Sequence, residues 1–339
     1  MDNSAKYRPW GRLREVINNI GRDKFFFYGC LSTEDRCVGA LSELEKMGAI
    51  GGVSLVEIAD IPSEYSESAA AKRYVNEKRF EEIGFGSALI EKIDLLDSEE
   101  KVFRWVEECI PRSSKVILDI SSLPKRFFFA AVKILLRDPR VEDLIVVYSL
   151  PTRYYGGNLA ERPSDWRALP LFGPQQYPDP KYDLAVVGVG FLPFGLPELL
   201  KSGFMEAKPH LFFPFPASPA TYTKTWDFVR QIESSLSLNA EDQLAQVNAI
   251  DPSDTFDHIN WLTDNGRLSA LFAPYGPKPM SLGMAVYAAI TGSPVFYTQP
   301  RVYHPDYSTG IKIGGDGHPL IYAYCLKLDG RDIYMVEKK

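Results

Sequence analysis

Two stretches of this 339-residue chain decide its fold: KVILDISSLPKRFFFAAVKILLR at 115–137 and LSALFAPYGPKPMSLGMAVYAAITG at 268–292. Each begins with a short apolar run, passes through a turn and continues into a longer run with helical periodicity. A strand, a turn and a helix form the repeating unit of a parallel α/β sheet. Both turns end in a Pro-Lys pair, so that Lys125 and Lys278 stand where the helices are expected to begin.

The elements around these stretches recur in the same order. Each half opens with an apolar run and a glycine-containing loop, GCLST at 29–33 and GVGFLPFG at 188–195. Farther on, VVYSLPTRYYGG at 146–157 parallels VFYTQPRVYHPDYSTG at 295–310. An ordered series of this kind indicates an internal duplication. The last segment, 320–337, is two β-rich runs around Asp-Gly, which is typical of a hairpin.

The predicted fold class is therefore α/β: two tandem Rossmann-like units with mainly parallel sheets, followed by a C-terminal β-hairpin. The length agrees, since 339 residues are about twice a typical domain. We place the first Rossmann-like domain at 1–161 and the second, with the hairpin, at 181–339. Residues 162–180 are rich in Pro, Gly and Trp and lack periodicity, which predicts a linker.

Composition excludes several classes of protein. With 45% hydrophobic residues the chain has enough apolar surface to form two cores, and its net charge of -6 argues against a broad nucleic-acid-binding face. No apolar run is long enough to span a membrane. The start of the chain lacks the apolar core of a signal peptide. Four scattered cysteines form no CxxC pair, so we expect a reduced, cytoplasmic setting; they are Cys30, Cys37, Cys109 and Cys325.

Metal and cofactor motifs are absent from the sequence. The four histidines are dispersed without zinc-ligand spacing, and neither Pro-Lys turn fits the P-loop pattern. We therefore predict no metal and no cofactor. No nucleophile, base and acid stand together in a recognisable motif either. His304 and Asp119 remain candidates for an acid-base group if the protein is an enzyme.

The two Pro-Lys turns form the first part of a candidate ligand site. In open parallel sheets, ligands bind beyond the carboxyl ends of the strands, where helix starts offer backbone N–H groups to anions. Lys125 and Lys278 would add positive charge there. Ser121, Ser122 and Ser281 would add hydroxyl donors. The structural alternative is that these are ordinary helix starts, for which Pro and Ser are common residues.

The loops after the opening strands form a second wall of the same site. Ser32 and Thr33 can hydrogen-bond a phosphate or ribose, and glycines such as Gly190 let a ligand approach the backbone closely. Beyond the fifth strands of the two halves, Arg and Tyr side chains suit phosphate pairing and base stacking or, equally, a domain interface. The candidates of this group are Arg153, Arg301 and Tyr303. Tyr148 and Tyr297, which match one another in the fifth-strand runs of the two halves, are candidates too.

The turn at Tyr275–Leu282, YGPKPMSL, resembles the Gly-Thr-Lys-Pro-Met turn of CARF domains, Rossmann-like sensors of cyclic oligonucleotides; Pro277 replaces the family's Thr. SAVED domains are similar, with two CARF-like units in one chain. The resemblance implies a ligand cleft between the two domains. It also implies that Lys278, Met280 and Ser281 are ligand-loop residues, with Lys125 as the counterpart in the first half. The chain carries no RxxxxH signature of a HEPN nuclease, so an effector would be a separate polypeptide.

These observations predict a sensor or regulatory subunit that binds a nucleotide or another phosphorylated small molecule and acts with a separate effector or companion subunit. Two alternatives stay open. One is an enzyme that acts on a nucleotide or sugar phosphate in the same crevice. The other is a structural subunit of a larger assembly, which the many aromatic residues would suit.

Overall fold

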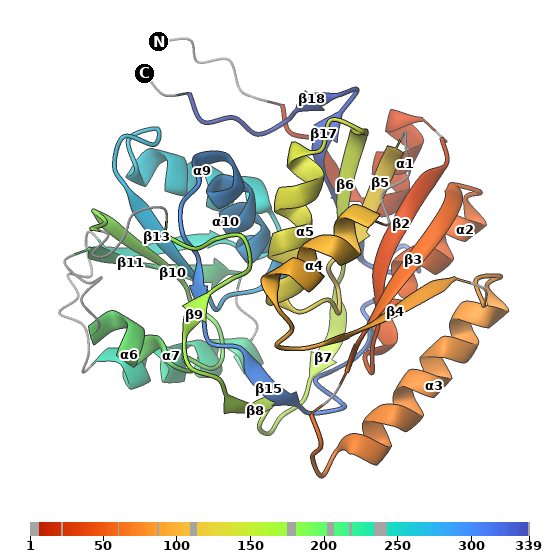
Figure 1. Cartoon of the computed structure of the whole chain (residues 1–339), viewed down its shortest axis with the longest axis horizontal. Helices are drawn as coiled ribbons and strands as arrows, with labels where there is room; N and C mark the ends of the chain where they lie inside the picture. The colour runs from red at the N-terminus through yellow and green to blue at the C-terminus, as the bar shows by residue number, and fades with distance from the viewer. Residues whose placement is uncertain are drawn as a thin grey trace.

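The computed structural model describes residues 7–21, 23–59, 61–86, 88–108, 114–174, 181–201, 207–216, 219–233 and 243–337. Cys109 and residues 175–180 of the predicted linker lie outside this range. Figure 1 shows two α/β halves side by side, the first in red to yellow and the second mainly in green to blue. Among the described helices, none is long and apolar enough to cross a membrane.

The first half contains, in chain order, β1 (Trp10–Arg12), α1 (Leu13–Ile20), β2 (Phe25–Leu31), the 3-10 turn η1 (Asp35–Cys37), α2 (Gly39–Lys46), β3 (Ile50–Ala59), α3 (Ser66–Glu82), β4 (Leu89–Asp94), α4 (Glu99–Glu108), β5 (Ser114–Asp119), α5 (Lys125–Arg137), β6 (Val141–Ser149), β7 (Pro151–Tyr154), β8 (Ala160–Pro163) and β9 (Arg167–Ala168).

The second half contains β10 (Leu184–Gly188), α6 (Leu196–Lys201), β11 (Lys208–Phe215), α7 (Pro219–Glu233), β12 (Leu244–Asn248), α9 (Pro252–Leu262), β13 (Ala270–Pro274), α10 (Lys278–Thr291), β14 (Phe296–Tyr297), β15 (Pro300–Tyr303), β16 (Ser308–Ile311), β17 (Ile321–Leu328) and β18 (Arg331–Asp332).

The two main sheets share one strand order, which confirms the predicted fold class. The larger sheet runs β1-β17-β6-β5-β2-β3-β4, and the smaller one runs β12-β11-β10-β13. Within them, β5-β2-β3-β4 and β13-β10-β11-β12 are the same fourth-first-second-third arrangement of parallel strands. A parallel bridge from Phe272 to Val295 adds a fifth position beside β13, as β6 does beside β5. This order is that of a Rossmann-like sheet.

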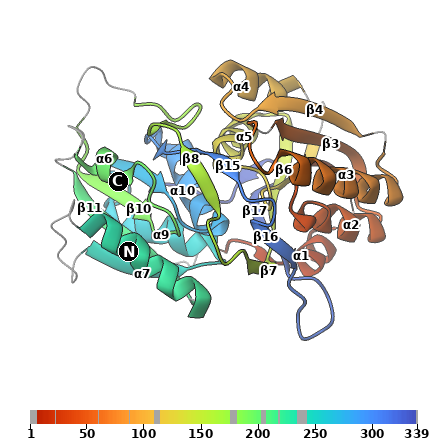
Figure 2. The ribbon, with the colours of Figure 1, turned by 90° about the horizontal axis from the view of Figure 1, so that it is seen from below.

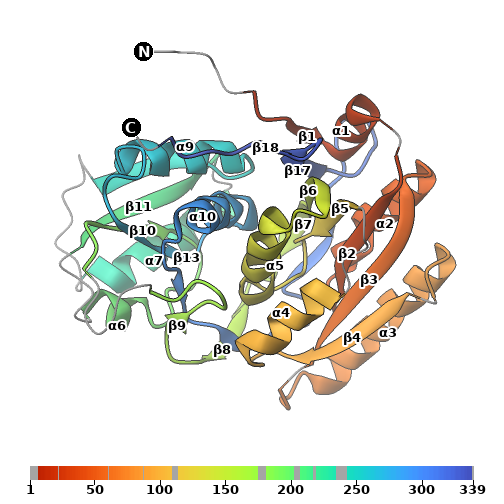
Figure 3. The same cartoon turned by 45° about the horizontal axis from the view of Figure 1, so that its top comes forward.

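The C-terminal hairpin, predicted as part of the second domain, lies in the sheet of the first half. β17 and β18 pair across the Asp-Gly turn as expected, but β17 also pairs antiparallel with β6 and with β1. The physical reason is that β6 would otherwise be an open edge, and a returning antiparallel strand satisfies its backbone groups. The first and last parts of the chain therefore belong to one sheet (Figure 3).

Residues of the predicted linker form short strands that join the halves. β8, which overlaps the start of the linker, pairs with β15, and β9 pairs with β14. β7 pairs in turn with β16. β7 and β15 occupy equivalent places in the duplication. Each pairs with a short strand of the other half: β7 of the first half pairs with β16, and β15 of the second half pairs with β8. Figure 2 shows these strands between the two halves.

Three apolar clusters arrange the elements in layers. On β5, Val116 and Leu118 face the central cluster while Ile117 faces the cluster beneath α1 and α2, as strand alternation requires. The central cluster continues through α4, α5, α9 and α10 to one face of the smaller sheet. The third cluster lies between the other face of that sheet and α6 and α7. One continuous core therefore unites the halves, with α5 and α10 packed side by side within it (Figure 3).

Close packing of α10 against the start of α9 depends on Gly283. A Cβ built on Gly283 would lie 2.5 Å from the carbonyl oxygen of Pro252 and 2.8 Å from Cβ of Thr255. Both neighbours are buried, and one is backbone, so neither can yield easily.

Gly283→Ala should therefore lower the free energy of unfolding by about 1–3 kcal/mol, because the added methyl group overpacks the core. Urea unfolding of the variant measures this. Gly315→Ala is the matched control, since a Cβ added at Gly315 would have no atom within 4 Å, and it should cost less than about 0.5 kcal/mol. Equal stability of the two variants would contradict the packing argument.

Candidate functional site

A cavity of about 750 Å³ lies between the halves, at the carboxyl ends of the strands of both sheets. Its lining includes the loops after β2 and β5 of the first half and those after β10 and β13 of the second. The parallel strands position these loops, because β2 and β5 end at the same edge of one sheet and β10 and β13 at the same edge of the other. The volume is within the range of small-molecule sites, roughly 300–1,000 Å³.

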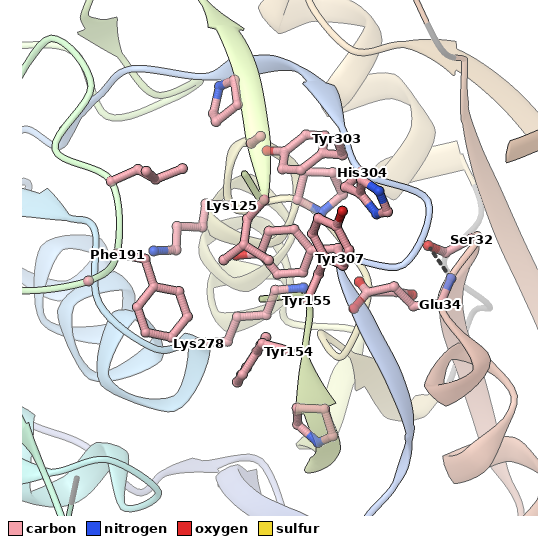
Figure 4. Close-up of a pocket in the computed structure, with 18 of the residues that line it drawn as sticks. Ser32, Glu34, Lys125, Tyr154, Tyr155, Phe191, Lys278, Tyr303, His304 and Tyr307 are labelled. Atoms are coloured by element: carbon pink, nitrogen blue, oxygen red, sulfur yellow. Dashed lines mark hydrogen bonds between the residues drawn. The ribbon is translucent and has the colours of Figure 1, made fainter. Parts of the chain in front are cut away.

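Lys125 and Lys278 cross this cavity in opposite directions. The Lys125 ammonium donates to the carbonyl oxygen of Gly276 at 2.7 Å and also to that of Pro274. The Lys278 ammonium donates to the carbonyl oxygen of Ser121 at 2.7 Å. Each lysine is the first residue of its helix, and each therefore binds the strand-end loop of the other half. Figure 4 shows both side chains among the aromatic rings of the cavity.

The local sequence explains why the two lysines are placed alike. The proline before each lysine is the helix cap, with φ -59° and ψ 150° at Pro124 and φ -54° and ψ 155° at Pro277. The ring fixes φ near these values before folding, and proline has no N–H to leave unsatisfied at the helix start. Two equal caps thus start α5 and α10 with the same geometry.

Removal from bulk water lowers the pKa of both lysines. Burial lowers the pKa of Lys125 well below its usual range, and the nearby Lys278 charge lowers it further. Burial, followed by the Arg36 charge, lowers the pKa of Lys278 to about 7, while Glu34, Cys30 and Asp119 act in the opposite direction. An anion in the cavity would raise both pKa values, because it replaces lost solvation with direct attraction.

The cavity is cationic in a chain of net negative charge. Among the described residues, its lining contains eight Lys or Arg side chains and one carboxylate, Glu34. The cationic residues are Arg36, Arg73, Lys125, Arg153, Lys224, Lys278, Arg301 and Lys312. A concave site with such an excess attracts anions from solution.

Glu34 and Arg36 form a buried ion pair in the loop after β2. The Arg36 Nε and Nη2 atoms donate to Oε2 of Glu34 at 3.0 and 2.8 Å, and Nη1 donates to the Ser149 carbonyl oxygen at 3.3 Å. The Ser308 hydroxyl of β16 also donates to Glu34. The pair holds the loop against the exchanged strand, while Ser32 and Thr33 of the same loop line the cavity.

Aromatic side chains from both halves complete the wall. Tyr154 meets Phe191 edge-on at 5.4 Å between ring centroids. Tyr155 stacks on His304 with 3.7 Å between ring centroids and 9° between ring planes, and Tyr65 meets His304 edge-on at 5.0 Å. Such rings suit contact with a flat, apolar part of a ligand.

Most of the predicted site residues converge on this cavity. The described lining includes Ser32, Thr33, Ser122, Lys125, Tyr148, Arg153, Gly190, Lys278, Tyr297, Arg301 and Tyr303.

Three predicted residues do not line the cavity. The Ser121 hydroxyl accepts from the Ser149 N–H at 2.8 Å, and that of Ser281 donates to the Gly276 carbonyl oxygen at 3.3 Å. Met280 is fully buried, and its sulfur packs beneath Gly188 and Gly276. All three hold the Pro-Lys turns in place from behind. Met280 and Ser281 do so because the first turn of α10 presents only part of its surface to the cavity, and Ser121 does so from the loop before α5.

Gly190 lines the cavity for a reason different from the predicted one. A Cβ on Gly190 would lie 1.9 Å from the Tyr275 carbonyl oxygen. The glycine therefore permits close contact between the loops after β10 and β13, in addition to any contact with a ligand.

Several lining residues escaped sequence analysis, including Glu34, Arg36, Arg73 and Lys224. The charged pair of Glu34 and Arg36, directly after the Ser-Thr turn, was the available signal. Arg73 and Lys224 lie on α3 and α7 with no motif around them.

Of the two acid-base candidates, His304 and Asp119, one lines the cavity. Across the described ranges, no three His, Cys, Asp or Glu side chains are grouped to hold a metal ion. Asp119 is buried outside the cavity lining and accepts from the Ser121 N–H. His304 does line it, with Nδ1 accepting from the Asp306 N–H at 3.0 Å.

Lys278 should make the empty protein less stable at neutral pH than at mildly alkaline pH. Its native pKa of about 7 is below that of a lysine in an unfolded chain, roughly 10.4. Between these values the unfolded state binds more protons, so the free energy of unfolding rises with pH. Lys278→Met should reduce this slope between roughly pH 7 and 8.5 by up to about 1.4 kcal/mol per pH unit, measured by urea unfolding.

The control for this measurement is Lys208→Met. Lys208 is exposed at the amino end of β11, away from the cavity. It should retain the wild-type slope. If Lys278→Met does so too, the ammonium group is solvated in the native protein and the argument fails.

No protein-family model and no curated protein matches this chain. Solved structures with distant likeness include the following two. The methyltransferase domain of bacterial CtHen1-CN is 18% identical at a TM-score of 0.23, over 41% of this chain and 65% of that domain. The cytoplasmic domain of a prokaryotic cation chloride cotransporter is 12% identical at a TM-score of 0.25, over 82% and 96% of the two chains. The strand order of this protein's own sheets defines its Rossmann-like α/β fold.

Proposed function

We propose that this protein is a sensor or regulatory subunit that binds a nucleotide, or another phosphorylated small molecule of similar size, in the cavity between its halves. The observation that carries the proposal is the pair of lysines that cross the cavity from opposite sides, within a lining of eight cationic residues and one carboxylate. Two like charges held together away from bulk water favour an anion between them.

The rest of the lining supports a nucleotide over inorganic phosphate. Phosphate alone would fill a small part of 750 Å³. Tyr154, Phe191 and Tyr303 add aromatic surface beside the cations. Arg and Lys pair with phosphate, and aromatic rings stack on bases.

A regulatory role follows from where the lysines are bound in the empty protein. Their ammonium groups satisfy carbonyl oxygens of the opposite half, at Gly276 and Ser121. A phosphate that draws an ammonium group away would weaken a contact between the halves. Occupancy is thereby linked to their relative position, which a separate effector or companion subunit can detect. The CARF-like turn at Tyr275–Leu282 supports the same regulatory role. We expect the protein to act in the cytoplasm.

The enzyme alternative rests on His304, the acid-base candidate in the cavity lining. Incubation of the protein with a nucleotide panel, followed by chromatography, distinguishes the two functions. A sensor returns each nucleotide unchanged, whereas an enzyme converts at least one. A purely structural subunit would bind none of them and would co-purify with its partner.

Lys125→Met combined with Lys278→Met should abolish thermal stabilisation by nucleotides. A ligand at a hundred times its Kd stabilises the native state by about 2.7 kcal/mol, which in a chain of this size raises Tm by several degrees. Differential scanning fluorimetry with AMP and ATP measures the shift. We expect a shift for wild type and for Lys208→Met, and less than about one degree for the double variant. An undiminished shift in the double variant would refute the site.

A further inference from the structure

The duplicated backbone encloses a cavity whose two ends differ in chemistry. After β2, the first half contributes Ser32, Thr33, Glu34 and Arg36 to the lining. At the equivalent place after β10, the second half contributes Val189, Gly190, Phe191, Leu192 and Phe194. The loop after β2 thus lines the cavity with hydroxyl and charged groups, and the equivalent loop after β10 lines it with apolar groups.

The neighbouring loops of the second half extend the apolar end. Pro214 and Pro216 lie at the carboxyl end of β11, and Ala249 and Ile250 come directly after β12. All four line the cavity without a side-chain hydrogen-bonding group. Apolar lining of this extent favours a part of the ligand that carries no charge.

The two lysines experience these different surroundings. The Lys278 ammonium reaches the polar end, where the charges of Arg36, Glu34 and Asp119 act on it. The Lys125 ammonium lies 5.4 Å from the Tyr297 ring centre and bonds to carbonyl oxygens. Among the described residues, Lys278 is the charged residue that lowers the pKa of Lys125. Lys278 is therefore the better partner for an anion, and Lys125 the better partner for a neutral acceptor.

The rim of the apolar end also suits an aromatic group. Phe191 presents its ring to the cavity beside Tyr154. The ammonium of Lys224 lies 5.5 Å from the Phe191 ring centre and donates to the Tyr155 carbonyl oxygen at 3.2 Å, which holds the rim together.

We infer that the ligand is a nucleoside monophosphate or a close chemical equivalent, bound in one orientation. Its single anionic group lies at the Lys278, Arg36 and Thr33 end, and its base lies at the Phe191 end. This inference rests on the proposed function and narrows it. A ligand with two equivalent charged ends would place one of them against Phe191, Leu192 and Pro216, where it loses hydration and where the nearby cation, Lys224, already donates to the Tyr155 carbonyl oxygen.

The experiment compares four probes by isothermal titration calorimetry: AMP, adenosine, inorganic phosphate and cyclic di-AMP, the last being a two-fold-symmetric dianion. The variants are Thr33→Val, which removes a hydroxyl at the polar end, and Phe191→Ala at the apolar end. Thr309→Val is the matched control, because Thr309 lies on β16 outside the cavity lining.

For wild type we expect AMP to bind more tightly than adenosine, phosphate or cyclic di-AMP. Thr33→Val should weaken AMP about tenfold, as expected for a lost hydrogen bond to a charged group, and leave adenosine unchanged. Phe191→Ala should weaken AMP and adenosine roughly 10- to 100-fold through lost stacking, and leave phosphate unchanged. Thr309→Val should match wild type throughout.

Distinct results overturn the inference and the proposed function. Tighter binding of cyclic di-AMP than of AMP, with both variants reducing it equally, would overturn the single orientation and leave nucleotide sensing intact. Weakening of phosphate but not adenosine by Phe191→Ala would do the same. If none of the four probes binds wild type, both proposals fail. Phe191→Leu, which keeps apolar volume, replaces Phe191→Ala if thermal melts show that the alanine variant is unfolded.

Discussion

The reciprocal reach of Lys125 and Lys278 is the interaction on which the site depends. Each ammonium group is removed from bulk water and satisfied by carbonyl oxygens at the end of the other half's fourth strand. The carbonyl contacts offset part of the cost of removing each ammonium group from water. The continuous core through α5 and α10 supports the same arrangement with apolar contacts. Hydrogen bonds and apolar packing therefore hold the two carboxyl edges around one cavity.

The sequence was sufficient to predict the elements of the fold but not every pairing between them. Apolar periodicity and the repeated Pro-Lys turns predicted both sheets, because these signals are local. The hairpin at β17 and β18 was predicted for the same reason. Periodicity does not say which sheet edge a strand joins, and so it could not predict that β17 pairs with β6. Nor could it predict β8 with β15, since the pairing of such short strands depends on their tertiary neighbours.

For the candidate site, the sequence predicted the location of residues that follow directly from their place along the chain. Residues at the carboxyl ends of predicted strands, such as Thr33, Lys125 and Lys278, do meet in the cavity. It failed at Met280 and Ser281, because the side of a helix that faces a cavity depends on how the helix packs. It also missed Arg36, since burial of a charged residue beside Glu34 becomes evident only when β16 closes over the loop. The sequence pattern predicts the element on which a residue lies, whereas the packing of that element decides whether its side chain faces the cavity.

If the cavity binds a nucleotide as we propose, the difference between its two ends lets a duplicated fold recognise an unsymmetrical ligand. Duplication supplies two equal helix starts and two equal strand edges, and so it fixes where the ammonium groups lie. The loops after β2 and β10 contribute no core strand, so they can change in chemistry while the backbone frame stays the same. At one end, the Glu34 carboxylate helps Lys278 keep its proton near neutral pH, against the effect of burial and of Arg36. At the other end, Phe191 and its neighbours leave Lys125 without an acidic partner. An anion gains most at the Lys278 end, so charge selects the orientation before the apolar surface adds affinity.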